Sequence, residues 1–109
     1  MAHGPAGVQE RVTATVEELR RRLPVSAIVV YGSQVEGRAD QWSDVDIAVF
    51  SPAVETMSLD DELDLLYEVH EAVGHDIDIR LFSDRSLEEA ATRPASFVAH
   101  ILKTGKRVA

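Results

Sequence analysis

The stretch "YGSQVEGRADQWSDVDIAVF", residues 31–50, decides how this chain folds. An apolar, β-branched run leads into it, and Gly32 and Ser33 end that run. After a polar loop, Asp44 and Asp46 alternate with apolar residues. Side chains along a strand point to opposite faces in turn, so this alternation predicts a strand with one apolar face and one acidic face. The stretch therefore predicts two strands joined by a polar loop, with two carboxylates on the same side of the second strand.

The flanking sequence predicts helices around these strands. Apolar residues recur every three or four positions in three segments, which is typical of a helix with one buried face. Ser58 and Gly74 are the expected cap residues of the middle helix, and Ser86 with Glu89 suggests the start of another. The expected elements are a helix from Val8 to Leu23, a strand from Val25 to Gly32, a strand from Asp44 to Phe50, a helix with a buried stripe of Leu59, Leu63, Leu66, Val69 and Val73, a strand from His75 to Phe82, and a last helix from Phe97 to Gly105.

This α-β-β-α-β-α order predicts an α/β (α+β) fold in which a small mixed sheet is packed with helices. A chain of 109 residues is expected to form a single domain, residues 1–109. It has no cysteine and no apolar run long enough to span a bilayer, so we expect a cytoplasmic protein without a membrane partner. Its formal net charge of -8 argues against direct binding to nucleic acid.

The carboxylates predict a metal site. Asp44 and Asp46 are two residues apart on one strand, so their Cα atoms lie about 7 Å apart on the same side and their charges repel. A third carboxylate comes from the last predicted strand, as either Asp76 or Asp78. Divalent cations offset such repulsion, and carboxylates on neighbouring strands can hold two Mg²⁺ ions roughly 4 Å apart for displacement at phosphorus.

The Gly-Ser step predicts a phosphate site next to these carboxylates. Gly32 has no side chain, so a phosphate can approach the backbone there. Ser33 supplies a hydroxyl and an amide hydrogen as donors. Hydrogen-bond donors for phosphate on one side and metal ligands on the other are typical of a site for a nucleoside triphosphate.

At these residues the sequence resembles the minimal nucleotidyltransferases of the DNA polymerase beta superfamily. Their pattern is Gly-Ser, ten residues and Asp-x-Asp, which here covers Gly32-Ser33, residues 34–43 and Asp44 to Asp46. Ser43 before the first aspartate also matches. The resemblance implies the polymerase beta-like fold, with Asp78 as the third catalytic and metal-binding carboxylate and Asp76 as the alternative.

The resemblance also implies an activity and a partner. The activity is magnesium-dependent transfer of a nucleoside monophosphate, AMP from ATP, to a hydroxyl. Stand-alone domains of this length often pair with a helical HEPN toxin and act as its antitoxin by modifying a tyrosine. Gln34 stands where many relatives carry arginine, and Arg38 or Arg80 can supply the missing cation. Gln34 favours the alternative function, a catalytically weak or inactive binding module that neutralises its partner by forming a complex.

Overall fold

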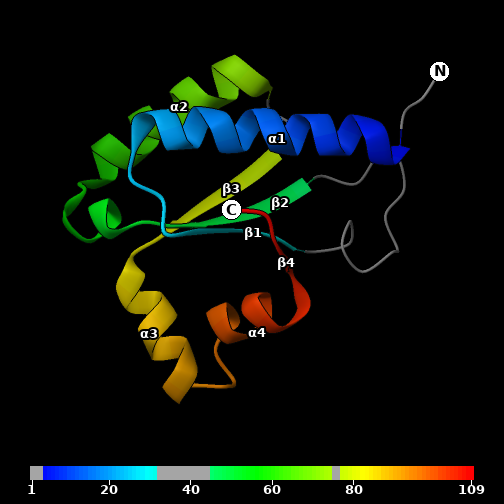
Figure 1. Ribbon diagram of the computed structural model, residues 1–109. Helices are drawn as coiled ribbons and strands as arrows, with labels where there is room; N and C mark the ends of the chain where they lie inside the picture. Colours follow the sequence, from blue (N-terminus) through cyan, green and yellow to red (C-terminus); the bar gives the residue numbers. More distant parts are fainter. Residues whose placement is uncertain (1–3, 32–44, 75–76) are drawn as a thin grey trace.

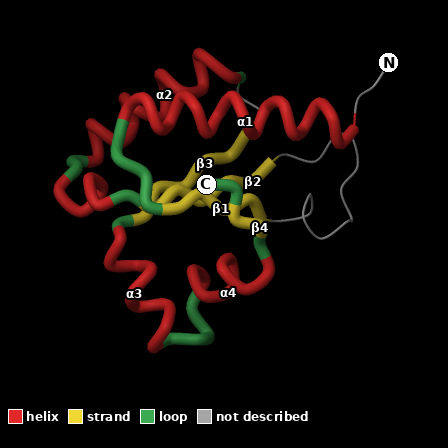
Figure 2. The backbone as a smooth tube through the Cα atoms, viewed as in Figure 1, coloured by secondary structure: helices red, strands yellow, loops and turns green. Residues whose placement is uncertain are grey.

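The computed structural model describes residues 4–31, 45–74 and 77–109, and these form a four-stranded sheet between two layers of helices. Figure 1 shows α1 and α2 on one side of the sheet and α3 and α4 on the other, and Figure 2 gives the same view coloured by secondary structure. The elements in chain order are α1 (Gly4–Arg22), β1 (Ala27–Tyr31), β2 (Val45–Phe50), the 3-10 helix η1 (Pro52–Thr56), α2 (Leu59–Val73), β3 (Ile77–Phe82), α3 (Asp84–Thr92), α4 (Phe97–Thr104) and β4 (Lys106–Arg107).

The sheet is mixed, as predicted. Its strand order is β3-β2-β1-β4, in which β1 is antiparallel to both β2 and β4 while β2 and β3 are parallel. Parallel neighbours need a crossover connection, and α2 provides it. The predicted fold class is therefore confirmed.

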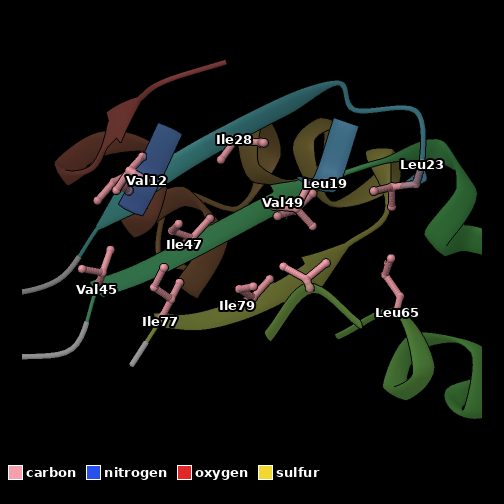
Figure 3. Close-up of a cluster of buried hydrophobic side chains, with 12 residues drawn as sticks. Val12, Leu19, Leu23, Ile28, Val45, Ile47, Val49, Leu65, Ile77 and Ile79 are labelled. Atoms are coloured by element: carbon pink, nitrogen blue, oxygen red, sulfur yellow. The ribbon is translucent and has the colours of Figure 1, made fainter. Parts of the chain in front are cut away.

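The larger core lies between the sheet and the pair α1 and α2. Residues 45, 47 and 49 of β2 and residues 77 and 79 of β3 all point into it, because alternate residues of parallel neighbours in register share a face (Figure 3). Leu19 of α1 and Val69 of α2 cover them and are fully buried. This is the predicted apolar face of the second and third strands.

A second core lies on the opposite face of the sheet. Ala48 and Phe50 of β2 are fully buried there against Val29 and Ile101. The Phe50 ring stacks on Phe82 at a centroid distance of 5.2 Å. The face predicted to be acidic carries Asp46 and Asp78 where β2 and β3 begin, while Ala48, Phe50 and Phe82 farther along the strands pack under α3 and α4.

Helix α2 begins and ends where the sequence predicts. The Ser58 side chain accepts a hydrogen bond from the Asp61 amide at 3.1 Å, and Gly74 ends the helix with φ 109°. The predicted buried stripe is only partly correct, because Leu59 and Leu63 are 70% and 55% exposed. The helix is turned so that its inward residues are Leu65, Leu66, Val69 and Val73.

Three other local features differ from the prediction. Helix α3 is capped by Ser83, and Ser86 lies inside the helix, because the chain turns directly after β3. Strand β4 pairs with β1 at Val29 and Val30 through only two residues, too few to leave a periodic pattern in the sequence. The 3-10 helix η1 follows Ser51, whose hydroxyl accepts a hydrogen bond from the Ala53 amide.

Within the described residues, no helix combines the length and the apolar character that a bilayer span requires.

Candidate active site

Strand register places two carboxylates opposite one another. In the parallel pair β2 and β3, Asp46 is the register partner of Asp78. Directly paired residues of neighbouring strands project to the same side of the sheet. Both aspartates therefore lie on the face that carries α3 and α4, close to the points where their strands begin.

The antiparallel pair adds Tyr31 to the same row. Tyr31 is the last residue of β1 and the register partner of Asp46. The row therefore runs from Tyr31 through Asp46 to Asp78 across three strands. Tyr31 and Asp46 are half-buried and Asp78 is exposed, so a ligand from solvent can reach the end of the row.

An aromatic and cationic cluster lies beside the row. The Arg80 guanidinium carbon is 5.6 Å from the centroid of the Phe97 ring, a cation-π arrangement. Tyr31 meets the same Phe97 ring edge to face, with the centroids 6.0 Å apart and the planes at 84°. These contacts hold the phenol of Tyr31 and the guanidinium of Arg80 together next to the carboxylates.

The carboxylates and the arginine act on the phenol through their charges. Burial raises the pKa of Tyr31 above its ordinary value of 10.0, and the charges of Asp46 and Asp78 raise it further. The charge of Arg80 and a hydrogen bond from its side chain act in the opposite direction. Among the described residues, two anions and one cation thus act through their charges on a single hydroxyl group.

The carboxylate pair suits a hard divalent cation. Mg²⁺ prefers oxygen ligands and is commonly held by one or two carboxylates together with the phosphates of a substrate. Asp46 and Asp78 provide two such ligands from adjacent strands. Among the described residues no group of three metal-ligating side chains occurs, while Asp44 and Asp76, the other predicted ligands, lie outside those residues.

The predicted phosphate-binding segment also lies outside the described residues. Of the residues expected to be functional from the sequence, the structure therefore places Asp46, Asp78 and the alternative cation Arg80, and it brings these three to one face of the sheet. The residues that it does not describe are Gly32, Ser33, Gln34, Arg38, Ser43, Asp44 and Asp76.

Sequence reasoning missed Tyr31 and Phe97 as members of the site. A signal for Tyr31 exists, because it is the last residue before the Gly-Ser step and an antiparallel return strand brings an acidic residue opposite it. No local signal marks Phe97, which reaches the site because α4 packs against β1.

The comparison with protein families gives one match. The family described as "Nucleotidyltransferase domain" matches residues 12–98, a range that includes β1, β2, α2 and β3. No curated protein matches the chain.

Solved structures of similar fold include three that cover most of this chain. A crystal structure from Sulfolobus solfataricus, assigned provisionally as a nucleotidyltransferase, is 17% identical with a TM-score of 0.57 and covers 82% of this chain and 84% of its own. A toxin-antitoxin structure with AMP-PNP is 26% identical with a TM-score of 0.56, covering 87% of this chain and 69% of its own. A mutant of the toxin-antitoxin MntA-HpeT is also 26% identical with a TM-score of 0.56, covering 90% of this chain and 71% of its own.

Proposed function

Since the chain belongs to the nucleotidyltransferase domain family, we propose that it transfers AMP from ATP to a hydroxyl group of a partner protein and acts as the antitoxin of a toxin-antitoxin pair. The acceptor in this proposal is a tyrosine of a helical HEPN-type toxin. The observation that carries the catalytic part is the register of Asp46 with Asp78, because the reaction needs two carboxylates close together on one face of the sheet.

The residues of the chain have separate roles in the proposed reaction. Asp46 and Asp78, together with Asp44, would hold two Mg²⁺ ions, and Gly32 and Ser33 would hold the phosphates. When bound, the metal would neutralise phosphate charge and favour ionisation of the acceptor hydroxyl. Asp78 accepts the proton of that hydroxyl.

The bond changes balance without a further reactant. The acceptor oxygen forms a bond to the α-phosphorus of ATP, and the bond from that phosphorus to the oxygen bridging to the β-phosphate breaks. Pyrophosphate leaves, and the AMP group remains on the acceptor oxygen.

The antitoxin role is supported by likeness to two solved toxin-antitoxin structures. Each is 26% identical to this chain, and one of them contains AMP-PNP, an analogue of ATP. An adenine nucleotide and a protein partner are therefore the first substrates to test.

The test is transfer of label from ATP to the protein that co-purifies with this chain. We expect label from the α-phosphate and none from the γ-phosphate, because AMP is transferred and pyrophosphate is released. Asp46→Asn should abolish the label while the circular dichroism spectrum stays unchanged. Absence of label on a tightly bound partner would reject transfer and favour the binding module that neutralises its partner by forming a complex.

A further inference from the structure

Helix α2 carries an exposed apolar stripe on its outer surface. Leu59, Leu63 and Tyr67 follow one another at intervals of four residues and are 70%, 55% and 64% exposed. At about 100° per residue, residues four apart lie on the same side of a helix, so the three side chains form one continuous strip. We call these three residues the α2 stripe.

The α2 stripe is additional to the face that the core uses. Leu65 and Val69 point inward and are buried, and Leu66 and Val73 pack beside them. The apolar surface of α2 therefore extends beyond the part that the core covers. A helix that only covers one face of a sheet needs no second apolar strip.

Acidic residues border the stripe. Asp60 and Asp64 are exposed and lie next to the stripe on the helix surface, since each stands three positions before a stripe residue and residues three apart are neighbours on a helix. The first turn of α2 contains Asp60, Asp61 and Glu62, and the whole chain has a formal charge of -8. A surface that complements the stripe and its border is apolar in the middle and basic at the edge.

Charge argues against a second copy of the chain as the occupant. Pairing α2 with α2 of another copy would bring the two acidic borders together, and like charges at short distance repel. Contact with a basic partner involves no such repulsion.

The stripe is also separate from the carboxylate pair. Helix α2 packs on the face of the sheet that carries the larger core (Figure 1), and strand register puts Asp46 and Asp78 on the opposite face. A partner bound to α2 leaves the carboxylates accessible.

We propose that the α2 stripe is a docking surface for an amphipathic helix of a partner protein whose apolar face is bordered by arginine or lysine. The apolar strip supplies affinity, and the acidic border selects basic partners and orients them. The surface acts independently of the transfer reaction, so its test does not depend on the proposed function.

The test uses a synthetic peptide because the partner is not identified. The probe is a labelled helical peptide of about eighteen residues with leucine at three- and four-residue intervals and arginine along both edges of the leucine face. One control peptide has the same composition in scrambled order, and another has glutamate in place of arginine. Fluorescence anisotropy measures the Kd of each.

We expect saturable binding of the probe and at least roughly tenfold weaker binding by the double variant Leu63→Gln, Tyr67→Gln. The matched control is Leu102→Gln on α4, because Leu102 is 39% exposed and α4 lies across the sheet from α2. Leu102→Gln and Asp46→Asn should bind the probe peptide with the same Kd as the wild type. Thermal melts of each variant show that the fold is retained.

Three results would overturn the proposal. The first is no saturable binding of the probe, and the second is equal binding of the scrambled peptide, which would leave only nonspecific charge attraction. The third is a dimer of the chain, seen by sedimentation, that the double variant abolishes, which would make a second copy the occupant.

Discussion

At the scale of single residues, the site depends on charges held close together by strand register. Asp46 and Asp78 face each other across β2 and β3, and Tyr31 continues the row on β1. Arg80 lies over the Phe97 ring and offsets part of the negative field at the phenol. Among the described residues, the carboxylates therefore share their surroundings with a cation, Arg80.

The register gives a prediction that separates Asp78 from Asp76. Asp78→Asn should reduce AMP transfer at least about a hundredfold, because it removes the carboxylate opposite Asp46. Asp76→Asn is the matched control and should retain transfer. Label transfer from ATP measures both variants, and loss of transfer in Asp76→Asn with retention in Asp78→Asn would reverse the assignment.

The Tyr31 phenol gives a second prediction. The chain has two tyrosines, so in a Tyr67→Phe background the phenolate absorbance reports Tyr31 alone. The titration midpoint should lie above 10.0, chiefly because burial disfavours the phenolate. Adding Asp78→Asn should lower the midpoint, since one of the charges that raise the pKa is removed.

The raised pKa of Tyr31 also predicts how the stability of the protein changes with pH. The folded protein holds the phenol proton more tightly than the unfolded chain does, so this contribution to stability is present below pH 10.0 and is lost as the pH rises through the folded pKa. Tyr31→Phe should remove the part of the loss of stability at alkaline pH that comes from ionisation of this phenol. A midpoint below 10.0 in the folded protein would contradict both expectations.

At the scale of elements, the caps of the helices differ in how they are made. Ser58 caps α2 with a hydrogen bond from the Asp61 amide to its side chain, at 3.1 Å. Ser83 caps α3 without a side-chain hydrogen bond. The end of α1 is tied to α2 instead, through Arg22 and Glu68 at 3.4 Å.

The caps of α2 and α3 predict different losses of stability when the capping serine is replaced by alanine. Ser58→Ala should lower the free energy of unfolding by about 1 kcal/mol, because the Asp61 amide loses its acceptor. Ser83→Ala is the control and should cost less. Urea denaturation followed by circular dichroism measures both, and equal losses would mean that the Ser58 hydrogen bond contributes nothing.

At the scale of the whole molecule, β2 joins two cores. Ile47 points toward α1 and α2, whereas Phe50 points toward α3 and α4, and both are fully buried. Each face of the strand therefore depends on a different pair of helices.

This arrangement predicts that the two cores unfold together. Ile47→Val and Phe50→Leu should each lower the free energy of unfolding by about 1 kcal/mol and shift one cooperative transition. Far-UV and near-UV circular dichroism should give the same midpoint in each variant. Separate midpoints in Phe50→Leu would show that the α3 and α4 side unfolds alone.

The sequence by itself determined helix α2 and the motif. The bounds of α2 follow from Ser58, Gly74 and the apolar spacing between them, because caps and periodicity act over a few residues. The Gly-Ser and Asp-x-Asp pattern is likewise local, and the match of the nucleotidyltransferase domain family confirms the resemblance it implied.

Only the tertiary structure decided how these elements meet. The pairing of Asp46 with Asp78 needs the register of a parallel crossover, and the place of Tyr31 needs the antiparallel return. The rotation of α2, which leaves Leu63 exposed, depends on packing against α1 and the sheet. Register and rotation are set by contacts between residues far apart in the chain, and no short stretch of sequence contains that information.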